Sequence, residues 1–157
     1  RNSSPVRKTI GRQAWASANV VARARRGAVC GPPANIEQYL EDFARPLLQP
    51  AAVGLVTVDP VQKVRLALVT LVGGARLELI QPLDATSPVS QRLQSRAGGL
   101  YHLCYAVADL EAALAEFRRK GCWRVSGPTP AALFEGRRIA FLYTPQHDLI
   151  ELLEEAP

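Results

Sequence analysis

The chain has 157 residues, of which 48% are hydrophobic and 21% are charged, and its formal net charge is +5. This length and mixture exclude a disordered chain and two independent domains of ordinary size, so we predict one globular domain. No apolar run approaches the roughly 20 residues that a membrane-spanning helix needs, and no membrane passage is expected.

The positive charge is concentrated at the N-terminal end. Seven basic residues precede the first acidic residue, Glu37, and the remainder has a small excess of acidic residues. We therefore expect no nucleic-acid binding, and we interpret residues 1–33 as a basic arm or an atypical first strand. The Ala, Val and Arg content of residues 9–26 also favours a helix. Three cysteines without a C-x-x-C pair predict no disulfide framework and favour a cytoplasmic protein.

The next predicted element is a helix, and it occurs twice. Asn35 can cap the first turn of one copy and Asp109 that of the other. In the residues that follow each cap, apolar side chains recur at the spacing of one helix face. These residues are Ile36, Tyr39, Leu40 and Phe43 in the first copy, and Leu110, Ala113, Leu114 and Phe117 in the second. The displacement of about 74 residues indicates an internal repeat.

Strands are predicted after each helix. They cover residues 53–58, 63–72 and 75–80 in the first copy, and 122–126, 137–143 and 148–153 in the second. A further strand, residues 100–107, precedes the second helix. One helix and one apolar sheet face cannot close a core alone. We therefore predict an α+β domain, residues 34–157, in which two β-α-β-β-β modules, 34–97 and 98–157, form a concave mixed sheet with both helices on its convex side.

Three polar residues interrupt the apolar strands. His102 shares a strand face with Cys104, which we interpret as a small buried hydrophobe. Glu78 and Glu151 stand at matching points of the two copies, and burying them without a partner would be costly. Taken singly, each is more simply explained as a solvated or hydrogen-bonded side chain. Together, two carboxylates and an imidazole suit a divalent metal ion.

The motifs YHLCYAVADL (residues 101–110), GARLELIQPL (74–83), SPV (87–89) and LIEL (149–152) resemble those of the vicinal oxygen chelate superfamily of glyoxalases, bleomycin-resistance proteins and dioxygenases. The similarity covers about residues 35–155 and is greatest to methylmalonyl-CoA epimerase-like members. It implies a metal ion held by Glu78, His102 and Glu151, and carboxylate and imidazole ligands suit cobalt, manganese, nickel, zinc or magnesium. The fourth ligand, normally a histidine, would stand at Ala28, so we predict weak or absent metal binding. Water or His147 would have to complete the set of ligands.

The resemblance also implies a reaction, namely proton transfer next to the carbonyl of an acyl thioester-like substrate by an epimerase, isomerase or lyase. Glu151, and secondarily Glu78, would move the proton. Arg137 and Arg138 either bind an anionic substrate group or are simply exposed residues at the start of a strand. Val61 stands where the epimerases place a glutamate proposed as a base.

The alternative is a non-catalytic, resistance-type protein that binds a small molecule beside a degenerate metal site. Because relatives of this fold often dimerise, we expect a homodimer whose other partner is a small-molecule substrate or ligand.

Overall fold

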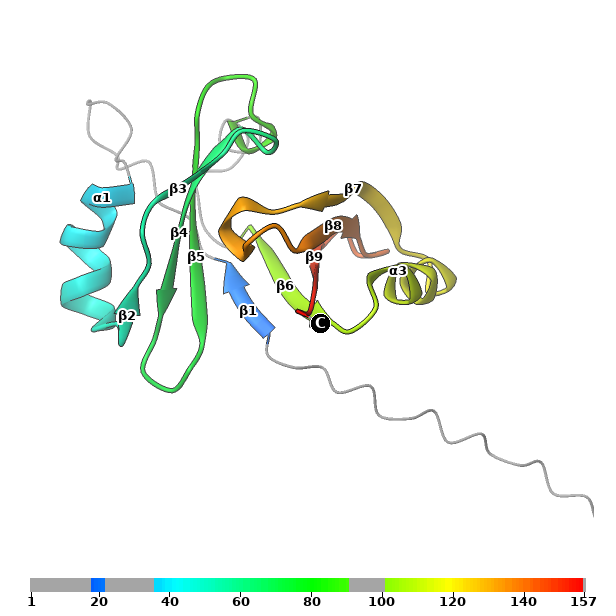
Figure 1. The fold of residues 1–157 in the computed structure, drawn as a ribbon, viewed down its shortest axis with the longest axis horizontal. Coiled ribbons are helices and arrows are strands. Elements are labelled where there is room, and N and C mark those ends of the chain that lie inside the picture. The colour runs from blue at the N-terminus through cyan, green and yellow to red at the C-terminus, as the bar shows by residue number, and fades with distance from the viewer. Residues whose placement is uncertain (1–17, 22–35, 91–100, 157) are drawn as a thin grey trace, which may run out of the picture.

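The computed structural model describes residues 18–21, 36–90 and 101–156. In this part of the chain, strands form one mixed sheet in the order β2-β4-β5-β1-β6-β9-β8-β7, with β3 paired to β4 (Figure 1). The strands are β1 Ala18–Val21, β2 Ala52–Val53, β3 Thr57–Asp59, β4 Val64–Thr70, β5 Arg76–Pro82, β6 His102–Val107, β7 Trp123–Pro130, β8 Arg138–Tyr143 and β9 Leu149–Glu154. No helix in the described ranges is long and apolar enough to cross a membrane.

The predicted α+β architecture of two repeated modules is confirmed. In the first module, helix α1 (Ile36–Tyr39) continues as a wider π-helical segment, η1 (Leu40–Leu48). In the second module the helix is α3 (Leu110–Arg119), and a short 3-10 turn, η2 (Ala132–Phe134), precedes β8. Figure 1 shows α1 beside the strands of the first module and α3 beside those of the second.

Each helix start is held by a side chain. Asp109 caps α3 as predicted, because its Oδ1 accepts a hydrogen bond from Ala112 N at 2.9 Å. The corresponding Asn35 lies outside the described residues. At α1, the backbone N–H of Ile36 donates instead to Gln81 Oε1 of β5 at 3.1 Å.

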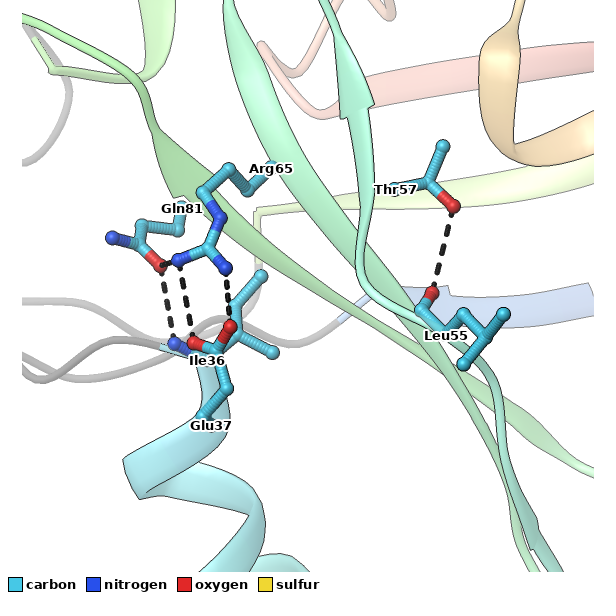
Figure 2. Close-up of polar contacts among 6 residues, drawn as sticks. All are labelled: Ile36, Glu37, Leu55, Thr57, Arg65 and Gln81. Atoms are coloured by element: carbon cyan, nitrogen blue, oxygen red, sulfur yellow. Dashed lines mark hydrogen bonds and ion pairs between the residues drawn. The ribbon is translucent and has the colours of Figure 1, made fainter.

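Figure 2 shows how the sheet fixes this end of α1. Arg65 of β4 donates from Nη1 to the same Gln81 Oε1 at 3.2 Å, and its guanidinium also pairs with Glu37. The three side chains thus join β4 and β5 to the first turn of the helix. This attachment brings the apolar face of α1 onto the sheet.

Side chains alternate between the two faces of the sheet, as the period of a strand requires. The helix-facing core of the first module contains Ile36, Leu40, Ala44, Ala67, Val69, Leu77 and Leu79. That of the second contains Val107, Leu110, Ala140, Leu142, Ile150 and Leu152. The intervening residues form a third cluster on the opposite, concave face, namely Val64, Leu66, Ile80, Val89, Cys104, Ala131, Phe134, Ile139 and Leu153. Cys104 is fully buried there, as expected.

Strand β1 lies at the centre of the sheet, so residues 18–21 are not part of a helix. It runs parallel to β5 and antiparallel to β6. In the antiparallel pair Val20 faces Leu103, and the flanking pairs are Asn19 with Cys104 and Val21 with His102. This register relates the two modules by a local two-fold axis near Val20 and Leu103.

Candidate metal and substrate site

Three buried polar side chains meet on the concave face. Glu78 comes from β5, His102 from β6 and Glu151 from β9, and their exposed fractions are 5%, 3% and 2%. One ligand atom from each lies within 4.8 Å of those from the other two. The structure therefore brings together the three residues that the sequence singled out. They converge because β9 pairs directly with β6, and only β1 separates β6 from β5.

The imidazole of His102 is held in a defined position. Its Nε2 forms a hydrogen bond with Glu151 Oε2 at 3.0 Å. The rings of Tyr101 and Phe141 pack edge-on against it, each with its centroid 5.2 Å away. Its other nitrogen, Nδ1, is buried without a hydrogen-bond partner among the described residues. A buried nitrogen that lacks a partner is costly unless something else binds it.

The surroundings of Glu78 affect its protonation. Burial raises the pKa of Glu78 well above its ordinary value, and the negative charges of Glu151 and Asp59 raise it further. A divalent cation among these groups would offset both effects, because it stabilises the deprotonated carboxylate. Two carboxylates and an imidazole, one of whose ring nitrogens has no partner among the described residues, thus fit a divalent ion with oxygen and nitrogen ligands.

A cavity of about 680 Å³ opens above Glu78 and His102, which is a typical size for a small-molecule site. Its walls come from both modules and are mostly apolar or uncharged. They are lined by Val61, Gln62, Val64, Leu66, Glu78, Ile80, Pro88, Val89, Tyr101, His102, Val125, Ser126, Thr129, Phe141, Tyr143 and Leu149. No lysine or arginine belongs to this described lining.

The turn after β3 contributes two residues that the sequence analysis did not single out. Asp59 is fully buried and accepts four N–H groups, and one of these comes from the side chain of Gln62. Gln62 lines the cavity together with Val61, whose side chain is largely exposed. An aspartate followed by Pro60 signals a turn. Its long-range bond to Ala132 N leaves no trace in the sequence.

Other candidate residues lie elsewhere. Arg138 is occupied by ion pairs with Glu154 and Glu111, and Arg137 donates from Nε to Phe134 O at 3.2 Å. Neither lines the cavity, so these contacts favour the simpler interpretation of an exposed strand entry.

His147 is also outside the buried cluster of ligand atoms. It is exposed and lies edge-on to Trp123, with 5.5 Å between the ring centroids.

The position equivalent to His102 is corrected by the strand register. Leu77 and Ile150 each precede the matching glutamates, Glu78 and Glu151. Leu77 pairs with Val20 and Ile150 pairs with Leu103, so Val20 corresponds to Leu103. Asn19, one residue earlier, therefore corresponds to His102. We predicted Ala28, which lies outside the described residues. That prediction assumed a constant displacement between the modules. Residues 22–35 separate β1 from α1, whereas only residues 108 and 109 separate β6 from α3, so the displacement changes before the first helix.

Comparison with known proteins supports the same architecture. The profile of the Glyoxalase/Bleomycin resistance protein/Dioxygenase superfamily matches residues 36–141. Ethylmalonyl-CoA/methylmalonyl-CoA epimerase of Cereibacter sphaeroides is 30% identical over 105 residues, which span 65% of this chain and 78% of that enzyme. Mitochondrial methylmalonyl-CoA epimerase of Mus musculus is 31% identical over 72 residues, which span 45% and 40% of the two chains.

Two solved structures extend the similarity to the fold. Methylmalonyl-CoA epimerase of Mycobacterium tuberculosis superposes with a TM-score of 0.75 at 24% identity, covering 96% of this chain and 95% of that one. A variant of the Streptomyces coelicolor methylmalonyl-CoA epimerase in complex with 2-nitronate-propionyl-CoA has a TM-score of 0.70 at 25% identity, covering 88% and 96%.

Proposed function

Because the chain belongs to the glyoxalase/bleomycin resistance protein/dioxygenase superfamily, we propose that it transfers a proton at the carbon next to the carbonyl of an acyl thioester, as an epimerase or a related isomerase. The observation that carries the proposal is the convergence of Glu78, His102 and Glu151 beneath a cavity of small-molecule size. The curated relatives are named as epimerases of ethylmalonyl-CoA and methylmalonyl-CoA, which supports a thioester as the substrate class.

Glu78, His102 and Glu151 would hold the divalent ion. Bound there, it would polarise the carbonyl of the substrate and stabilise the negative charge that develops when the neighbouring carbon loses its proton. His102 would bind the ion rather than move a proton, because Tyr101 and Phe141 pack against its ring and its Nε2 is hydrogen-bonded to Glu151 Oε2.

The carboxyl groups would handle the proton. A carboxylate has two oxygens, so one that binds an ion through the first can take a proton with the second. Glu151 takes the proton from the substrate in this proposal. Glu78 would act as the second proton carrier, through the carboxylate oxygen that does not bind the ion.

The experiment is solvent deuterium exchange at the α-carbon of acyl thioesters, followed by NMR. We expect Glu151→Gln to slow the exchange by about 100-fold or more, since a positioned acid or base contributes roughly 10²–10⁴-fold. Glu41→Gln is the matched control, because Glu41 is an exposed carboxylate on η1. Exchange at the normal rate in a folded Glu151→Gln protein would remove Glu151 from the mechanism.

A binding protein without turnover is the second candidate, and one observation favours it. By strand register Asn19 corresponds to His102, so no histidine stands at the symmetry-related position. Thioester binding with no α-proton exchange in the metal-supplemented wild type would select this candidate.

A further inference from the structure

The turn that borders the cavity is fixed by one buried carboxylate. Asp59 Oδ1 accepts the backbone N–H groups of Val61 and Gln62, each at 2.9 Å. Asp59 Oδ2 accepts the N–H of Ala132, in the second module, at 3.3 Å. Both modules therefore define the position of this turn.

The same carboxylate sets the orientation of the Gln62 amide. Gln62 Nε2 donates to Asp59 Oδ2 at 3.2 Å. A carboxylate that already receives N–H groups can only accept, so a reversed amide would place two oxygens against each other. Gln62 makes no other side-chain hydrogen bond among the described residues. Since Gln62 lines the cavity, its carbonyl oxygen Oε1 is the polar atom left for a ligand.

The charged residues around the cavity also disfavour a ligand carboxylate. Its described lining contains no lysine or arginine, and it includes Glu78, with Glu151 and Asp59 buried nearby. A ligand carboxylate beside Gln62 would meet an acceptor oxygen and no side-chain cation from the described lining residues. A neutral N–H or O–H group there would instead find a hydrogen-bond acceptor.

We propose that Gln62, oriented by Asp59, determines specificity: the cavity selects an acyl group that carries a neutral hydrogen-bond donor over one that carries a carboxylate at the same position. Gln62 contacts the ligand and Asp59 is the positioning residue. The inference takes only the thioester class of ligand from the proposed function.

The test compares two ligands that differ in this group alone, the coenzyme A thioesters of malonic acid and of its monoamide. Dissociation constants are measured by calorimetry with chelator present. We expect the wild type to bind the monoamide more tightly. Gln62→Met keeps the length of the side chain but removes the acceptor, and should weaken monoamide binding by roughly threefold to tenfold, the range of one neutral hydrogen bond. Gln146→Met, at an exposed residue outside the cavity lining, should change neither constant.

Asp59→Asn separates positioning from simple structural support. The asparagine can offer an N–H toward Gln62 in place of Oδ2, at the cost of the bond from Ala132 N, and the Gln62 amide can then turn its Oε1 toward residue 59 and its Nε2 toward the cavity. A merely damaged turn would weaken both ligands alike. We expect the preference to reverse, so that the malonyl thioester becomes the tighter ligand, in a variant whose circular dichroism shows it to be folded.

Different results would overturn this inference and the proposed function. Wild-type protein that binds the malonyl thioester as tightly as the monoamide, or Gln62→Met with the wild-type preference, overturns the inference. Repeating the titrations with manganese(II) should raise carboxylate affinity equally in wild type and Gln62→Met, leaving the difference between them intact. A monoamide preference without α-proton exchange would contradict only the proposed function, and exchange without the preference would contradict only this inference.

Discussion

Glu78 illustrates how the surroundings of one residue set its chemistry. It is an ordinary carboxyl on a strand, yet burial and two neighbouring negative charges raise its pKa. Its raised pKa in the folded state means that the folded protein holds this proton more firmly than the unfolded chain does. The stabilising effect is complete at low pH and is lost as the pH rises through the folded pKa.

Glu78→Gln should therefore be most stabilising at high pH. Glutamine mimics the protonated carboxyl and does not titrate, so the variant escapes the loss that the wild type suffers. Thermal unfolding in chelator at about pH 5 and about pH 8 is the measurement. We expect the melting temperature of the variant minus that of the wild type to be larger at the higher pH than at the lower pH. Glu41→Gln, at an exposed site, should show a constant difference, and a constant difference for Glu78→Gln would contradict the raised pKa.

The three buried residues that could hold a metal ion could be singled out from the sequence, but the residues of the turn could not. His102 and Glu151 follow from period-two alternation within their own strands, which is local information. The role of Asp59 depends on an N–H donor at Ala132, across the boundary between the modules. Gln62 gains its orientation only through Asp59, and the sequence analysis noted only its neighbour Val61, which stands where the similar epimerases place a glutamate.

Among the elements, the hairpin of β7 and β8 has the closest backbone contact of the described glycines. Gly127 has a φ of +81°, and a Cβ atom there would lie 2.4 Å from Ile139 O and 2.8 Å from Ala140 Cα. The register of β7 against β8 shifts on either side of Ser126, so the strand already deviates from regular pairing here. Because the contacts are backbone atoms, they cannot move aside as a flexible side chain can.

Gly127→Ala should consequently destabilise the protein by about 3 kcal/mol or more, from the left-handed φ together with the clash. Gly136→Ala is a matched control, since Gly136 has a φ of +79° and a Cβ atom added there would have nothing within 4 Å. That control should cost only about 1 kcal/mol, which is the cost of the backbone conformation alone. Urea unfolding of both variants gives the comparison, and equal losses would contradict a steric role for Gly127.

The elements also differ in how well the sequence predicted them. The helices and the strands β4, β5, β8 and β9 follow from strong apolar periodicity, and their predicted bounds are off by only a few residues. The single strand expected over residues 53–58 is instead β2 and β3. An atypical first strand was one of two interpretations of residues 1–33, but its place at β1 was not predicted, because these four residues are stabilised by pairing with β5 and β6 rather than by a local pattern.

For the whole molecule, the local two-fold axis is the feature that organises the site. It passes between β1 and β6, and it relates β5 to β9, so the two glutamates of the cluster are equivalent. The symmetry is imperfect at one functional position, where His102 is matched by Asn19. An amide binds transition metals less strongly than an imidazole does, and a harder ion such as manganese or magnesium tolerates it better.

Asn19→His should restore a nitrogen donor at the symmetric position and tighten the binding of cobalt or zinc by at least about tenfold, because affinity for such ions increases with each imidazole ligand. Calorimetric titration of wild type and variant measures the change without any need for substrate. Ala28→His is the matched control, since residue 28 is the position that a constant displacement between the modules would select. Tighter binding in Ala28→His with no change in Asn19→His would contradict the register of β1, and with it the two-fold relation between the modules. A gain in Asn19→His alone would mean that the second module's ligand arrangement extends to the first, and that one residue accounts for the weaker metal affinity predicted for this chain.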